Sequence, residues 1–276
     1  IRGGRPIGPE LLDDLVARYR GLGIDDSDAP SPLNVVTEET RAALEETLGL
    51  PVLTGMRHWQ PRIATAVDEA IAQGHDQLVG LVLAPHWSTM SIAKYEALFD
   101  EAVGNRVETR FVREWGAEPG FVELVARRCR DALDDDRSAH VIFTAHSLPA
   151  SILERGDTYA DALSRTAGLV AARAALGDRW TFAYQSESAT GEPWLGPDIL
   201  DHLGALADQG VSDVLVCPVG FVSDHLEIRW DLDVEACGRA TELGLGLSRI
   251  EMPNADPELV ETLAGIVRRE LAAVAA

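Results

Sequence analysis

Residues 140–149 have the sequence HVIFTAHSLP. The first seven are almost continuously apolar and rich in β-branched residues, which predicts a strand buried on both faces of a sheet. A similar run, LVGLVLAP, occupies residues 78–85. Strands of this kind occur in parallel sheets whose two faces are covered by helices. The two runs therefore favour an α/β fold.

Apolar runs and amphipathic helical stretches alternate along the chain. Strands are expected at residues 51–54, 78–84, 140–145, 181–184 and 211–218. Helices are expected at residues 9–21, 37–48, 61–73, 119–133, 159–176, 197–209 and 257–274. Several of these helices begin with proline or carry an acidic residue in the first turn, as helix starts commonly do. The alternation predicts parallel sheets, and residues 103–118, without clear periodicity, are expected to connect two halves.

His146 lies at the end of a predicted buried strand and is followed by a turn. Ligands of open α/β sheets bind beyond the carboxyl ends of the strands. An imidazole at this place can bind a metal ion or accept a proton near neutral pH. The alternative is a structural histidine bonded to a backbone carbonyl. Ser147 does not indicate a hydrolase, because no G-x-S-x-G motif surrounds it.

A second candidate site begins in PVGFVSDHLE, residues 218–227, and continues into IRWDLDVE. Glu227, Asp231 and Glu235 are spaced four residues apart and would share one side of a helix. Like charges at this spacing cost only a few tenths of a kcal/mol, so a solvated helix face could also carry them. Their position after a strand favours a site for Fe²⁺ or Mg²⁺, or a route for protons. The loop YQSESATGEPWLGPD, residues 184–198, is a third candidate, either for binding or as a long ordered connection.

The composition and the motifs of the chain argue against several classes of function. The 276 residues suffice for two domains, and the net charge of −21 argues against nucleic acid as a partner. Neither a dinucleotide-binding fingerprint nor a P-loop occurs, which disfavours NAD and ATP enzymes. The three cysteines do not form a CxxC pair, so we expect reduced thiols. We expect no transmembrane segment and no secretory signal, and a cytoplasmic protein.

The segments GMRHW, VLAPHWS, FTAHSLP, YQSE…PWLGPD and PVGFVSDHLE, in this order and spacing, resemble the ferrochelatase family. The resemblance extends over nearly the whole chain. IRGGRPIGPELL at the start and MPNADPELVETLA near the end are more similar to the coproporphyrin III branch than to the protoporphyrin branch.

The resemblance implies two Rossmann-like, chelatase-type lobes with a porphyrin cleft between them. The first lobe would comprise residues 1–108 with the C-terminal helix, residues 256–276, and the second residues 109–255. The family pattern makes His146 and Glu227 the catalytic pair, and His146, Glu227, Asp231 and Glu235 the metal-contacting residues. The residues expected to contact the porphyrin are Arg2, Arg18, Tyr19, Ser31, His58 and Tyr95.

The sequence departs from the family pattern at its start. The opening strand with its AYGTP-like motif, which supplies an iron-ligating tyrosine in the coproporphyrin branch, is absent, so the first strand of the first lobe is expected to be missing. Some relatives bind an iron–sulfur cluster through cysteines near the C-terminus, but no cysteine follows Cys237, so we expect neither a cluster nor another prosthetic group.

The expected reaction is insertion of Fe²⁺, a substrate, into coproporphyrin III on the way to haem b. Transient contact with neighbouring haem-pathway enzymes is a further expectation. Alternatives are a protoporphyrin IX ferrochelatase, a cobalt or nickel chelatase for a related tetrapyrrole, and a non-catalytic porphyrin or haem carrier.

Overall fold

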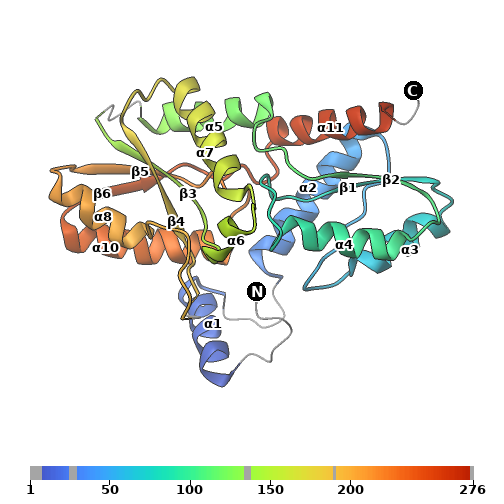
Figure 1. Ribbon diagram of the computed structural model, residues 1–276, viewed down its shortest axis with the longest axis horizontal. Helices are drawn as coiled ribbons and strands as arrows, with labels where there is room; N and C mark the ends of the chain where they lie inside the picture. Colours follow the sequence, from blue (N-terminus) through green and yellow to red (C-terminus); the bar gives the residue numbers. More distant parts are fainter. Residues whose placement is uncertain (1–7, 25–29, 134–137, 189–190, 274–276) are drawn as a thin grey trace.

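Two parallel sheets form the framework of the structure, a computed structural model that describes residues 8–24, 30–133, 138–188 and 191–273 (Figure 1). The helices are α1 (Pro9–Gly21), α2 (Pro32–Leu48), α3 (Ile63–Ala72), α4 (Ile92–Val103), α5 (Pro119–Leu133), α6 (Ser151–Glu154), α7 (Tyr159–Arg173), α8 (Ile199–Asp208), α9 (Leu226–Trp230), the π-helix η1 (Asp231–Ala236), α10 (Cys237–Leu243) and α11 (Pro257–Ala272). The strands are β1 (Gln77–Leu81), β2 (Glu108–Val112), β3 (His140–His146), β4 (Trp180–Gln185), β5 (Asp213–Cys217) and β6 (Gly246–Arg249). We call the part from α2 to β2 the first half, and the part from α5 to β6 the second half.

The second half contains a four-stranded sheet in the order β4-β3-β5-β6. All its strand pairs are parallel, and His146 at the end of β3 lies opposite Gln185 of β4. The chain runs from β3 to β4 on one side and then crosses to β5 on the other side of β3. This reversal makes the carboxyl ends of β3 and β5 a topological switch point, where α/β sheets bind their ligands.

Alternate residues of the central strands pack into two different apolar cores. Val141 and Phe143 of β3 contact the cluster that contains α5 and α7. Ile142, between them, belongs to the cluster formed with α8 and the segment from α9 to α10. Successive side chains of a strand point to opposite faces, so covering both faces requires the apolar run seen in the sequence.

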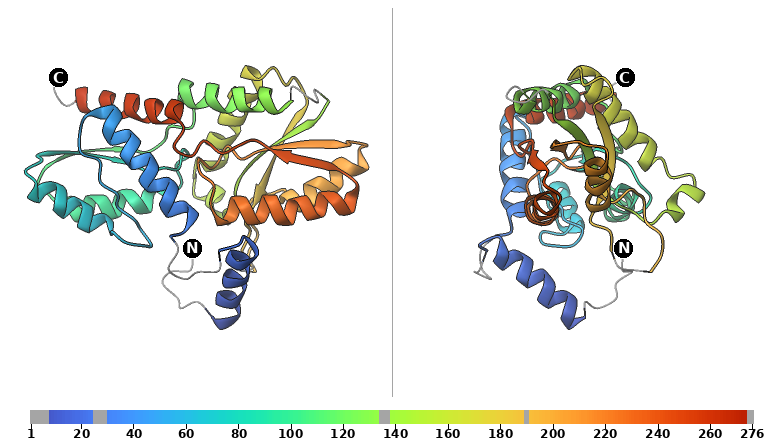
Figure 2. Two further views of the ribbon diagram at one scale, coloured as in Figure 1. Left: turned by 180° about the vertical axis from the view of Figure 1, so that it is seen from behind. Right: turned by 90° about the vertical axis from the view of Figure 1, so that its left-hand side faces the viewer.

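The first half contains the pair β1–β2, in which Gln77 lies opposite Glu108 and Leu81 opposite Val112. Side chains of α3 and α4 pack with those of both strands in one cluster. α11 contacts β1 and α2, and it also contacts α5 of the second half. α5 and α11 follow one another along one side of the molecule in both orientations (Figures 1 and 2). The last helix therefore connects the two halves.

Helix α1 lies apart from the two layered halves (Figure 2) and contacts α9. Gly21 at its end lies against the Trp230 ring, where an added Cβ would fall 2.5 Å from a ring carbon. Glycine thus lets the helix cross this tryptophan closely, and a larger residue would have to displace the ring.

The structure confirms an α/β fold with parallel sheets and corrects several predicted elements. Residues 51–54 do not form a strand. Residues 103–118 were expected to be a connection, but they contain β2, which pairs with β1. The expected lobe boundary between residues 108 and 109 falls inside this strand. The helix α4 and the edge strand β6 were not predicted. β2 and β6 were missed because their sequences, ETRFV and GLSR, mix polar and apolar residues and lack a long apolar run. The division into two lobes remains a prediction.

Candidate active site

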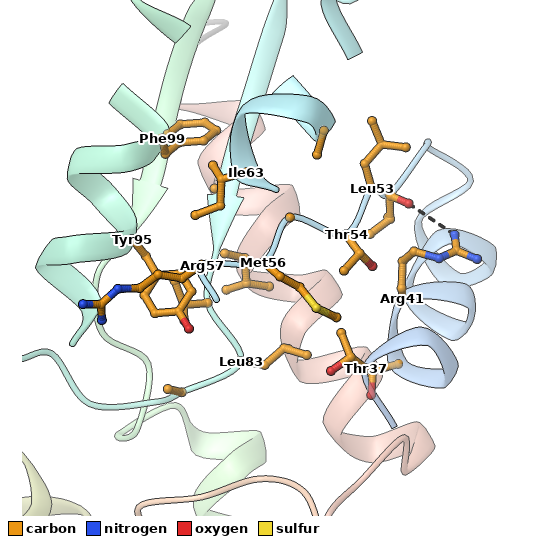
Figure 3. A pocket seen from close by; sticks show the side chains of 18 of the residues that line it. Thr37, Arg41, Leu53, Thr54, Met56, Arg57, Ile63, Leu83, Tyr95 and Phe99 are labelled. Atoms are coloured by element: carbon orange, nitrogen blue, oxygen red, sulfur yellow. Dashed lines mark hydrogen bonds between the residues drawn. The ribbon is translucent and has the colours of Figure 1, made fainter. Parts of the chain in front are cut away.

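A pocket of about 1080 Å³ is lined by side chains from both halves. The first half contributes residues of α2, α3, α4 and β1; the second contributes His146, Tyr159, Glu227 and the loop after β5. In Figure 3, Arg57 and Tyr95 form one side of the pocket, and Thr37 and Arg41 of α2 form the opposite side. The volume lies at the upper end of the range for small-molecule sites and suits a large ligand.

His146 is the last residue of β3 and has a defined ring orientation. Its Nδ1 contacts the carbonyl oxygen of Ser147. A carbonyl only accepts hydrogen bonds, so Nδ1 carries a proton. Nε2 lies 3.5 Å from Glu227 Oε1 and is therefore the atom that gains or loses a proton.

A second imidazole faces the same carboxylate. His225 Nε2 lies 3.5 Å from Glu227 Oε2, and its Nδ1 lies 3.1 Å from the carbonyl oxygen of Ser223. Glu227 thus lies between two histidines, yet 40% of its side-chain surface remains accessible, so a ligand in the pocket can reach it.

The pKa values of His146 and Glu227 depend on each other. Burial lowers the pKa of His146, but the hydrogen bond and charge of Glu227 outweigh burial and raise it overall. Burial raises the pKa of Glu227, but hydrogen bonds from His146 and His225, with their charges, outweigh burial and lower it overall. The pair favours imidazolium beside carboxylate. Nε2 can therefore receive a metal ion or another proton only after its own proton has left.

Asp231 and Glu235 continue from Glu227 along α9 and η1, as the four-residue spacing predicts. Asp231 is buried, and burial raises its pKa to about 6, with contributions from Glu227 and Glu235. Ser186 Oγ donates to Asp231, which was not predicted. Arg18 Nη1 lies 3.5 Å from Asp231, and Nη2 lies 3.7 Å from Glu235. π-helices are rare and frequently mark functional sites.

The predicted metal-contacting residues do not form one coordination shell. In the part of the chain that the structure describes, no group of three or more His, Cys, Asp or Glu side chains could hold an ion together. His146 and Glu227 face the pocket as a pair, whereas Asp231 and Glu235 are not among its lining residues.

Two predicted porphyrin contacts, His58 and Tyr95, line the pocket. The Arg57 guanidinium lies 5.8 Å from the centre of the Tyr95 ring, as Figure 3 shows. This stacking holds the positive charge of Arg57 at the pocket wall. Arg57 was not among the predicted porphyrin contacts. Burial and the charge of Arg57 lower the pKa of His58.

The other predicted contacts lie elsewhere. Ser31 caps α2 by accepting a hydrogen bond from Asn34 N at 3.3 Å. Tyr19 lies on α1, where burial and then the charge of Glu227 raise the pKa of its hydroxyl. Arg18 pairs with the acidic residues and is not among the pocket-lining residues. Arg2 lies outside the described residues.

A network that the sequence did not reveal supports the loop before Glu227. Asn254, with a φ of 50°, accepts a hydrogen bond from Asp224 N at 2.8 Å and donates to the Asp224 carboxylate at 2.9 Å. Arg249 Nη2 also donates to Asp224, at 2.9 Å. Of the missed residues, only His225 had a visible signal, since it lies in the segment that contains Glu227.

No helix among the described residues is long and apolar enough to cross a bilayer.

Comparisons with known proteins agree with this site. The family model of ferrochelatase matches residues 7–271. The chain is 40% identical over 292 residues to a ferrochelatase of Deinococcus radiodurans, covering 100% of this chain and 90% of that protein. It is 38% identical to a coproporphyrin III ferrochelatase of Halalkalibacterium halodurans, covering 99% of this chain and 90% of that protein.

Solved structures show the same architecture. SirB from Bacillus subtilis with Fe³⁺ has a TM-score of 0.60 at 14% identity, covering 87% of this chain and 91% of that chain. CbiX, a terminal enzyme of sirohaem biosynthesis in denitrifying bacteria, has a TM-score of 0.58 at 15% identity, covering 87% and 94%. These identities show a shared chelatase-type fold only. The match of the family model over nearly the whole length, with the histidine–glutamate pair at the sheet's switch point, shows that the chain belongs to the ferrochelatase family.

Proposed function

We propose that this enzyme inserts Fe²⁺ into coproporphyrin III and releases Fe-coproporphyrin III, or coproheme, in haem b biosynthesis. The family supplies the reaction class, a metal-inserting lyase acting on a porphyrin. The choice of coproporphyrin is supported by the relatives named for that substrate, among them those of Halalkalibacterium halodurans and Oceanobacillus iheyensis, at 38% and 36% identity.

The chemistry of the pocket wall supports a substrate with many carboxylates. Arg57 and His58 line the pocket beside apolar side chains. The guanidinium of Arg41, also at the wall, is already paired with Glu38 and Glu45. Guanidinium groups bind carboxylates in paired, charge-assisted hydrogen bonds, and apolar side chains cover a porphyrin ring. Coproporphyrin III carries four propionates where protoporphyrin IX carries two, so it gains more from this wall.

The mechanism we propose assigns different tasks to His146 and Glu227. Binding bends the planar ring and exposes a pyrrole nitrogen lone pair, at the expense of binding energy from the carboxylates. His146 first releases the proton that Nε2 holds beside Glu227 to the acidic residues or to solvent. It then accepts a pyrrole proton at Nε2, because its Nδ1 is already committed to Ser147, and the second pyrrole proton leaves in the same way once Nε2 is free again. Glu227, whose lowered pKa keeps it ionised, stabilises the imidazolium that forms.

Asp231 and Glu235 form the proposed route by which Fe²⁺ arrives or protons leave. Carboxylate oxygens are suitable transient ligands for Fe²⁺, and Arg18 offsets part of their charge while the route is empty.

The proposal includes no iron–sulfur cluster or other prosthetic group. The Sγ of Cys129 donates a hydrogen bond to the Sγ of Cys217 at 3.4 Å inside the core, and the two thiols are not joined by a disulfide. Free thiols also support a reducing compartment, so we place the reaction in the cytoplasm, where neighbouring haem-pathway enzymes would be transient partners.

Steady-state kinetics with the two porphyrins test the substrate. We expect kcat/KM for coproporphyrin III to exceed that for protoporphyrin IX at least tenfold, about 1.4 kcal/mol of transition-state binding. Arg57→Gln should reduce this preference, whereas Arg110→Gln, outside the pocket-lining residues, should not. Equal or reversed preference for the parent protein would contradict the proposal.

A further inference from the structure

The loop after β1, residues 85–89 with the sequence PHWST, is held against the second half at several points. The carbonyl oxygen of Pro85 accepts hydrogen bonds from Trp115 N at 3.0 Å and Gly116 N at 2.9 Å, in the segment that leads into α5 of the second half. The buried imidazole of His86 contacts Thr166 of α7 through Nε2, at 2.8 Å. The sequence places this loop beyond a buried strand, but the reaction described above does not use it.

The last residues of this loop bind a buried carboxylate of the second half. Asp157 lies between α6 and α7 and is 6% exposed. Its Oδ2 accepts hydrogen bonds from Ser88 Oγ at 3.1 Å, Thr89 N at 2.7 Å and Thr89 Oγ1 at 2.6 Å. Its Oδ1 accepts one from Tyr159 N at 2.9 Å.

These hydrogen-bond donors stabilise the negative charge of Asp157 in place of a cation. Burial raises the pKa of Asp157, but hydrogen bonds from Thr89, Tyr159 and Ser88 outweigh burial and lower it overall. Among the ion pairs of the described residues, none includes Asp157. A buried carboxylate without a cation is stable only while its hydrogen-bond donors stay in place.

The same carboxylate is linked to the catalytic histidine. Tyr159, whose backbone N–H binds Asp157, donates from its hydroxyl to the carbonyl oxygen of His146 at 3.0 Å. Tyr159 is buried and lines the pocket. Thr89 of the first half is thus linked to the end of β3. Hydrogen bonds join Thr89 to Asp157 and Asp157 to the backbone N–H of Tyr159, and the hydroxyl of Tyr159 then binds the carbonyl of His146.

We propose that Asp157 is a positioning residue for metal insertion: it holds the loop after β1 against the second half and, through Tyr159, fixes the backbone of His146. It does not touch the substrate. Its loss should therefore slow the chemical step more than it weakens porphyrin binding, which rests on the pocket wall.

The test compares Asp157→Asn with a matched pair at Thr89. Thr89→Val removes the hydroxyl donor but keeps the shape and the backbone N–H; Thr89→Ser keeps the hydroxyl. Fe²⁺ insertion is measured at temperatures well below each variant's melting temperature, with whichever porphyrin the parent turns over, so an inactive parent would count against the proposed function alone. We expect Asp157→Asn to lower kcat at least tenfold and Thr89→Val several-fold, with porphyrin KM changed less than threefold and Thr89→Ser near the parent.

Coupling to Tyr159 tests the path. If Asp157 acts through Tyr159, the double variant Asp157→Asn/Tyr159→Phe should lose little more kcat than Asp157→Asn alone. A merely structural carboxylate would lower the melting temperature and leave kcat of the folded protein within twofold of the parent in both Asp157→Asn and Thr89→Val. That result, a change confined to KM, or losses that multiply in the double variant would overturn the proposal.

Discussion

At the residue scale, the catalytic assignment depends on one nitrogen atom. His146 Nε2 points toward Glu227 because Nδ1 is bonded to the Ser147 carbonyl. The strand that carries it is buried and bonded to β4 and β5, so the ring projects into the pocket from a rigid base. A purely structural histidine would not need a second ring nitrogen that faces a solvent-accessible carboxylate.

His146→Ala should therefore slow insertion by about 10²–10⁴-fold, the usual contribution of a general base. Porphyrin affinity should change little, because it rests on carboxylate anchors and apolar contact. Single-turnover Fe²⁺ insertion and porphyrin Kd from fluorescence quenching measure the two effects separately.

His75→Ala is the control, since this partly exposed imidazole lines the pocket just before the start of β1, whereas His146 lies at the carboxyl end of β3. Near-parental insertion by His146→Ala would falsify the assignment, and a joint loss of melting temperature, binding and turnover would indicate a structural histidine instead.

At the element scale, the segment from α9 to η1 places carboxylates in an environment that disfavours their charge. Asp231 has 9% of its side chain exposed, and burial raises its pKa to about 6. Because the folded pKa lies above the unfolded one, the contribution of Asp231 to stability is present below about pH 4 and is lost as pH rises through about 6. Above that pH, the ionised Asp231 costs the folded protein about 3 kcal/mol of stability.

Asp231→Asn/Glu235→Gln should thus melt higher than the parent at pH 7.5, with a smaller difference at pH 5, and yet insert iron more slowly. Such an exchange of stability for activity is common at functional sites. Thermal melts at both pH values and insertion rates over a range of Fe²⁺ concentrations measure it, with porphyrin Kd as the control. Unchanged rates at every Fe²⁺ concentration would mean that these residues take no part in the arrival of iron or the departure of protons.

The elements also show how far sequence reasoning extends. The buried strands were predictable because only continuous apolar runs can cover both faces of a parallel sheet, and β3 and β5 confirm this. The placement of His146 opposite Glu227 followed from strand ends and family resemblance. By contrast, the pairing of Arg18 with Asp231 joins positions 213 residues apart, and that of Ser88 with Asp157 joins positions 69 apart. Such contacts arise from how helices pack, which no local pattern records.

At the scale of the whole molecule, negative charge is in large excess. The chain has 45 Asp and Glu against 24 Lys and Arg, a net charge of −21. Many arginines pair with carboxylates at the surface, and exposed pairs of this kind each contribute about 0–1 kcal/mol. The carboxylates in excess of the cationic side chains repel one another and weaken the compact state, and they attract cations such as Fe²⁺.

Salt should therefore stabilise this protein, although it weakens individual ion pairs. Raising NaCl from roughly 0.01 M to 1 M shortens the screening length from about 30 Å to about 3 Å, which removes long-range repulsion first. We expect the melting temperature to rise with NaCl and the KM for Fe²⁺ to increase, because screening also weakens attraction of the metal.

The matched variant is Glu39→Gln/Glu46→Gln/Glu101→Gln, at exposed positions on α2 and α4 that are not among the pocket-lining residues. It lowers the charge without touching the site, so its melting temperature should rise less steeply with NaCl while kcat stays unchanged. A salt slope equal to that of the parent would mean that chloride acts by exclusion from the surface, and that net charge has no measurable influence on the fold.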